Sequence, residues 1–154
     1  MRLLGLDVGD VKIGVAVCDS LEIAAFPVGL VRRVGSLKRD TATMAALAVE
    51  QEAEGIVIGL PLSLNGEIGS QAQKTQGFAK ALANLLPMPV VLWDESLSSV
   101  EAEELLIRRG VSRVKRRQQI DQTAAALILE SYLAHRRDTN APRDALVSAS
   151  CHPI

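Results

Sequence analysis

The chain has 154 residues, of which 48% are hydrophobic and 23% are charged, and its formal net charge is −1. This size and balance predict one globular domain that folds without structural disulfides, and the near-zero net charge argues against a generic nucleic-acid coat protein. No apolar run reaches the roughly 18 residues of a membrane-spanning helix. We expect an unexported, cytoplasmic protein with free thiols at Cys18 and Cys151.

The first part of the chain predicts a three-stranded antiparallel meander. "LLGLDVG", "KIGVAVCD" and "AAFPVGLVRR" are apolar segments separated by turns, as in consecutive strands. Pro27 places the third segment at a sheet edge or at a bulge, because proline cannot donate to a strand ladder. A helix is expected next, from Ser36 to Glu54, with Gly55 ending it.

The second part predicts alternating strands and helices. "GIVIG" is typical of a buried fourth strand and "PVVLWD" of a fifth. Capping boxes predict helices over residues 70–86 and 98–110, and after a basic loop a last helix runs from about Gln118 to Arg136. We expect one domain over residues 1–136 and a loose tail over residues 137–154.

This order of elements predicts an α/β fold. A meander followed by helix–strand units gives a mixed, five-stranded sheet flanked by helices, because parallel strands require helical crossovers. That arrangement is the RNase H-like layout.

Three acids stand where this topology brings elements together: Asp7 in the first strand, Glu95 after the fifth strand and Asp121 in the last helix. Each one alone is equally well explained by a turn or by the polarity of a helix start. Together they fall at one end of the sheet, where clustered carboxylates require a divalent cation to offset their repulsion. Oxygen ligands favour Mg²⁺ or Mn²⁺. Zinc is not expected, because His135 and His152 lie far from any ligand pattern.

Basic residues predict how a polyanion is held. Six lie between positions 108 and 117 without any acid. We expect contacts with a phosphate backbone from Lys12, Arg113, Lys115, Arg116 and Arg117. A solvated loop and a solvated hairpin lysine are the alternatives.

Four segments carry a resemblance to a known family. "GLDVGDVKIGVAVCD", "IVIGLPLSLNGEIG", "WDESLSS" and "RRQQIDQTAAALILESYL" resemble the YqgF (RuvX) family of Holliday-junction-resolvase-like nucleases, which are linked to ribosomal RNA precursor processing. The resemblance covers about residues 2–136 and implies an RNase H-like, metal-dependent phosphodiesterase. Its acidic residues fall on Asp7, Glu95 and Asp121. Ser96 stands where the family usually has arginine, and Asp10 where it commonly has threonine.

The function expected from this resemblance is hydrolysis at the 5′ end of pre-16S rRNA with two ions of Mg²⁺ or Mn²⁺, Asp7 bridging both. A Holliday junction resolvase acting on branched DNA is an alternative, and so is a non-catalytic nucleic-acid-binding module. A phosphotransferase of the actin–hexokinase type shares the D-x-G motif but needs a second half that this chain is too short to hold. Both a monomer and a homodimer are compatible with the sequence.

Overall fold

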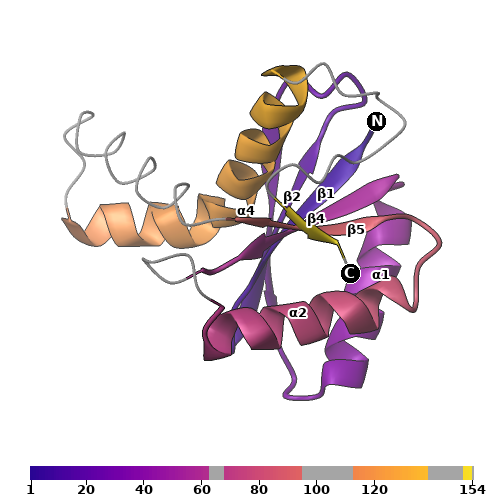
Figure 1. The fold of residues 1–154 in the computed structure, drawn as a ribbon. Helices are drawn as coiled ribbons and strands as arrows, with labels where there is room; N and C mark the ends of the chain where they lie inside the picture. The colour runs from indigo at the N-terminus through magenta and orange to yellow at the C-terminus, as the bar shows by residue number, and fades with distance from the viewer. Residues whose placement is uncertain (63–67, 95–112, 139–150, 154) are drawn as a thin grey trace.

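The computed structural model describes residues 1–62, 68–94, 113–138 and 151–153 of the chain. They build a mixed sheet with helices on both faces (Figure 1). The strands, in the sheet order β3-β2-β1-β4-β5-β6, are β3 (Ala25–Arg32), β2 (Lys12–Cys18), β1 (Leu3–Val8), β4 (Gly55–Leu60), β5 (Val90–Asp94) and β6 (Cys151–Pro153).

The first three strands form the expected antiparallel meander, and β4 and β5 run parallel to β1. All five expected strands and the mixed sheet are therefore confirmed. β3 lies at one edge of the sheet, and the β2–β3 register shifts between Val15 and Ala16, which pair with Gly29 and Pro27. Pro27 thus lies both at an edge and at a bulge.

Among the described residues, three helices cover the sheet. α1 (Leu37–Glu50) and α2 (Ser70–Ala83) lie on one face, and α4 (Arg113–Asp138) lies on the other (Figure 1). The core is accordingly split into two clusters of buried side chains, one between the sheet and α1/α2 and one between the sheet and α4. None of the helices in the described part of the chain is long and apolar enough to cross a bilayer.

On the α1/α2 face, one predicted helix limit and one predicted capping box are wrong. α1 ends at Glu50, because Glu52 adopts a left-handed backbone conformation (φ 56°). Glycine usually adopts this conformation after a helix, which is why the helix was expected to continue to Gly55. Gly55 instead opens β4. α2 is capped by Gly69, whose carbonyl accepts from the N–H of Gln73 at 3.0 Å, so Ser70 is the first helical residue and makes no capping box.

One prediction for the second part of the chain is also corrected. The helix expected from Gln118 begins at Arg113, because no glycine or proline interrupts a run of good helix formers. Within the segment expected to be a loose tail, residues 137–138 continue α4, and residues 151–153 pair antiparallel with β5 as a sixth strand. The helix expected over residues 98–110 lies outside the described residues.

Candidate active site

Asp7 is the next-to-last residue of β1 and faces α4. Side chains alternate along a strand, and Leu3, which has the same parity as Asp7, packs in the cluster against α4. The Asp7 side chain is half-buried. An ionised carboxylate in so apolar a strand is costly unless a cation or hydrogen bonds compensate it. The structure therefore places the first of the three acids at the carboxyl end of β1, beneath α4.

Gly5 lets α4 approach the strand that carries Asp7, and Gly14 lies beside the same contact. A Cβ added at Gly5 would lie 3.0 Å from both the Ala125 carbonyl oxygen and the Leu129 Cβ. Gly14 is the β2 partner of Asp7, and a Cβ there would lie 3.6 Å from the Cβ atoms of Asp7 and Ala125. The sequence did not predict the close contact at Gly5, because nothing in a strand pattern shows which glycine faces a helix.

Asp121 is placed through this close contact. α4 runs antiparallel to β1 here, since Leu129 and Ala125 lie over Gly5 and Ala125 also lies over the Asp7–Gly14 pair. Asp121 is four helical residues before Ala125, a rise of about 6 Å. The backbone of Asp121 is thus carried toward the end of the sheet where Asp7 lies. Its side chain is outside the described ones.

Glu95 lies outside the described residues, directly after β5. The strand itself is well placed for the site, because β1, β4 and β5 are parallel neighbours and end at the same edge of the sheet. Trp93 faces α4, and Asp94 pairs with Leu60, whose side chain packs on the α1/α2 face.

Trp93 fixes β5 relative to α4. Its indole Nε1 donates to the Ser131 Oγ at 3.2 Å, and its ring contacts Tyr132 edge-on with centroids 5.2 Å apart. His135 packs against the same indole at 5.1 Å. These contacts join the strand that leads to Glu95 and the helix that carries Asp121.

The donor set fits a hard divalent cation. Asp7, Glu95 and Asp121 offer oxygen ligands alone, which is the chemistry that Mg²⁺ and Mn²⁺ prefer. Among the described residues, no group of three His, Cys, Asp or Glu is placed to hold a metal ion, and only the Asp7 side chain of this set belongs to them. The buried Cys18 is a free thiol, and burial raises its pKa, which makes it a poor ligand.

A clamp on the β1–β2 turn was not expected from the sequence. The Arg33 Nη1 donates to the Gly9 carbonyl at 2.9 Å, and its Nε donates to the Asp40 Oδ2 at 2.9 Å. The Val34 N–H also donates to Asp40, at 3.0 Å. The bond from the Val34 N–H, together with that from Arg33, holds the pKa of the buried Asp40 carboxyl below its usual value. This clamp fixes the turn that follows Asp7, and no local pattern pairs Arg33 with Gly9.

The predicted phosphate-binding residues fall on two elements. Lys12 is exposed and opens β2. The other four lie in the first turns of α4 rather than in a loop, and Figure 1 shows this part of the helix pointing away from the sheet, while the later turns lie along it. Their side chains are outside the described ones. They are Arg113, Lys115, Arg116 and Arg117.

Known proteins share this fold. The structure of RuvC from Thermus thermophilus superimposes with a TM-score of 0.58 at 15% identity, covering 100% of both chains. That of T. thermophilus RuvC in complex with a Holliday junction substrate gives 0.57 at 16% identity, over 100% of this chain and 99% of the other. The fold is therefore α/β of the RuvC, or RNase H-like, class, as expected.

Sequence comparison identifies the family. Residues 1–135 match the model of the RuvX family, described as Holliday junction resolvase. A protein of Syntrophus aciditrophicus (strain SB), named as a candidate pre-16S rRNA nuclease, is 46% identical over 145 residues, which are 94% of this chain and 96% of that protein. One from Myxococcus xanthus (strain DK1622) with the same name is 47% identical over 137 residues, 88% of this chain and 90% of the other. The chain belongs to the RuvX family.

Proposed function

We propose that this chain is a metal-dependent nuclease whose substrate is the 5′ end of the 16S rRNA precursor. The observation that carries the proposal is the half-buried Asp7 carboxylate, held beneath α4 at the edge where three parallel strands end, in a member of the RuvX family. Ligands of open α/β sheets bind at this edge.

The roles of the acids follow from their places in the chain. Asp7 is central, because β1 lies between β2 and β4 in the sheet, and it would bridge two ions of Mg²⁺ or Mn²⁺ that Glu95 and Asp121 each help to hold. Such ions, when bound, lower the pKa of a water molecule and stabilise the leaving oxygen. Lys12 at the start of β2 and the basic turns of α4 would hold the phosphate backbone on either side of the site.

The RNA substrate is supported by the relatives at 46% and 47% identity, which are named for pre-16S rRNA. Such a substrate also implies a cytoplasmic site of action. The description of the family supports branched DNA as the second candidate substrate. Junction resolution requires two active sites related by symmetry, so it additionally predicts a homodimer on the junction.

Cleavage assays on both substrates test the proposal. The full chain is incubated with end-labelled pre-16S rRNA 5′ leader and with a four-way DNA junction, in Mg²⁺, in Mn²⁺ and in chelator. We expect metal-dependent cleavage of the RNA. Its rate should be at least about 100-fold lower in Asp7→Asn, because the substitution removes one of the groups that stabilise the charge developing in the transition state.

A matched control is Glu50→Gln, which makes the same change of carboxylate to amide at the exposed end of α1. It is expected to cleave like the wild type. Tight binding of both substrates without cleavage in any metal would replace the nuclease by a binding module. Cleavage of the junction alone would select branched DNA as the substrate.

A further inference from the structure

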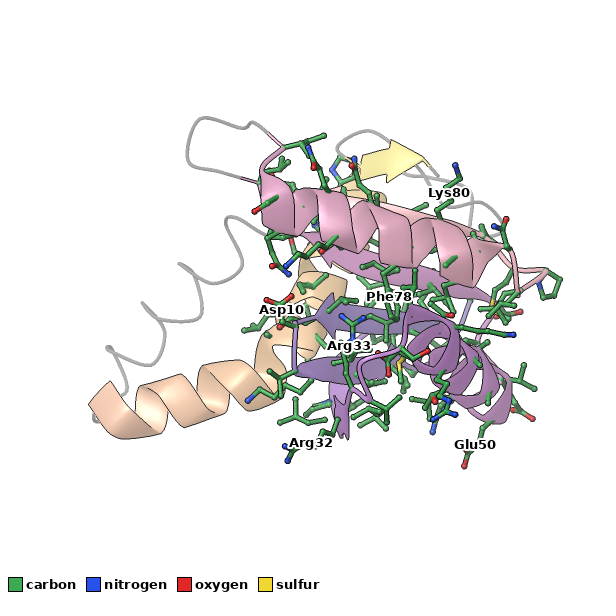
Figure 2. The ribbon with its side chains drawn as sticks, turned by 90° about the horizontal axis from the view of Figure 1, so that it is seen from below. Asp10, Arg32, Arg33, Glu50, Phe78 and Lys80 are labelled. Carbon is green, nitrogen blue, oxygen red and sulfur yellow. The ribbon has the colours of Figure 1, made fainter. Side chains whose placement is uncertain are left out.

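A cavity of about 480 Å³ lies beside the β1–β2 turn, on the opposite face of the sheet from α4. Its lining includes Asp10 from the turn, Arg33 from the end of the meander, and Lys74, Gly77 and Phe78 from α2. Figure 2 shows Asp10, Arg33 and Phe78 close together where α2 crosses the turn. The volume suits a ligand of the size of one nucleotide.

One wall of the cavity is flat and rigid. The guanidinium of Arg33 lies over the Phe78 ring, with its carbon 5.3 Å from the ring centroid. Its hydrogen bonds to the Gly9 carbonyl and to Asp40 fix the plane of the group. Phe78 is only 1% exposed beneath it, so the outer face of the Arg33 guanidinium is the plane on which an unpaired nucleobase would stack.

The rim of the cavity carries two exposed polar side chains that can turn toward a ligand. The Lys74 Nζ lies 3.6 Å from an Asp10 carboxylate oxygen, and the two side chains are 66% and 63% exposed. An ion pair so exposed contributes little to stability, so a ligand can separate its partners. The Asp10 carboxylate then offers two neighbouring acceptors and Lys74 offers a cation for phosphate.

Gly77 keeps the helical side of the cavity open. It lies within α2, where glycine costs about 1 kcal/mol relative to alanine. A Cβ at this position would meet no atom within 4 Å, so packing does not require the glycine. Space for a ligand against the helix is what the missing side chain provides.

We propose that this cavity binds one unpaired nucleobase of the substrate, with a preference for guanine. Guanine presents two adjacent N–H donors on its Watson–Crick edge, which match the two oxygens of Asp10, whereas adenine presents one donor beside an acceptor. Asp10 follows Asp7 by three residues, so their Cα atoms are at most about 11 Å apart, and a base in the cavity would lie around the edge of the sheet from Asp7, which faces α4. The choice of a nucleic-acid ligand rests on the proposed function.

Nucleotide binding without metal tests this assignment separately from cleavage. Amide spectra of ¹⁵N-labelled full-length protein are recorded during titration with guanosine 5′-monophosphate and with adenosine 5′-monophosphate, in chelator. We expect shifts at Asp10 and Gly77 and a dissociation constant at least fivefold lower for the guanine nucleotide. Absence of shifts there, or equal affinity for the two nucleotides, would overturn the proposal.

Two variants fix the location of the ligand. Gly77→Met fills the cavity and is expected to weaken binding of the guanine nucleotide at least tenfold, whereas Gln73→Met, at an exposed α2 position outside the lining, keeps it. Asp10→Asn is expected to bring the two dissociation constants within twofold of each other. Unchanged binding in Gly77→Met, with a thermal midpoint that shows a folded protein, would contradict the assignment.

Failure of the proposed function is distinguishable. Asp7→Asn is expected to bind the guanine nucleotide like the wild type while losing cleavage. A wild type that cleaves no nucleic acid but shows the expected nucleotide preference would refute the nuclease and retain the cavity. Cleavage of pre-16S rRNA without nucleotide shifts at the cavity would retain the nuclease and refute the guanine site.

Discussion

Replacing Gly5 by alanine tests whether the close seat of α4 on β1 sets the geometry of the site. The new Cβ would lie 3.0 Å from the Ala125 carbonyl oxygen and from the Leu129 Cβ, both on α4. Carbon atoms pack best at about 3.5–4.0 Å, so the helix must move by roughly half an ångström or more. Overpacking of this kind costs about 1–3 kcal/mol.

The cost appears in stability and in catalysis. For a domain of this size, about 1–3 kcal/mol lowers the thermal midpoint by roughly 2–12 °C. Because α4 carries Asp121, we also expect kcat to fall by about tenfold or more, since misplacement by about 1 Å can cost 100-fold. Circular dichroism melts and single-turnover cleavage measure the two effects.

Gly14→Ala is the matched stability control. Its Cβ would meet its nearest neighbours at 3.6–3.7 Å, which is ordinary contact, so we expect a change in thermal midpoint of less than about 2 °C. Equal destabilisation by the two alanines, or none by Gly5→Ala, would refute the argument that the helix is seated through Gly5.

Three further changes have definite expected outcomes. Asp40→Asn should destabilise the protein by about 1–3 kcal/mol at neutral pH, since it weakens bonds from Val34 and Arg33. The pKa of Asp40 is lower in the folded protein than in the unfolded chain. Its stabilisation is therefore present at a pH above the unfolded pKa and is lost as the pH falls through the folded pKa. The thermal midpoints of the wild type and of Asp40→Asn should converge below about pH 4. Gly77→Ala should raise the thermal midpoint by about 2–4 °C, because it adds helix propensity in open space. Changing the basic residues Arg113, Arg116 and Arg117 to glutamine should weaken RNA binding and flatten its dependence on salt by about 0.7 in log–log slope for each lost phosphate contact, as filter binding would measure.

The sheet was predictable because its signal is local. Each of β1 to β5 is a short apolar segment ended by turn residues. β4 and β5 each follow a helix, and a helical crossover is the usual connection between parallel strands. β6 was not predictable, because its three residues have no period of their own and pair with β5 through tertiary contact. Helix limits failed where the backbone of Glu52 took the conformation expected of a glycine.

The candidate site was predictable in its residue types and less so in its surroundings. The position of Asp7 followed from the strand, whereas the close approach of α4 at Gly5 did not follow from the sequence. The contact of α4 with Gly5 and the bond from Arg33 to Gly9 each join residues distant in the sequence. The geometry of these contacts depends on which faces of the strands and helices pack against each other, and no single segment of the sequence encodes it.

The most direct test of the account is to locate the divalent ion at Asp7. Substoichiometric Mn²⁺ broadens amide signals of nuclei near it, and we expect the strongest broadening at Asp7, Gly14 and Ala125, with Glu50 unaffected. The effect should disappear in Asp7→Asn and be displaced by excess Mg²⁺. Broadening that persists in Asp7→Asn, or that centres on Asp10 and Lys74 instead, would contradict the proposal that Asp7 holds the metal.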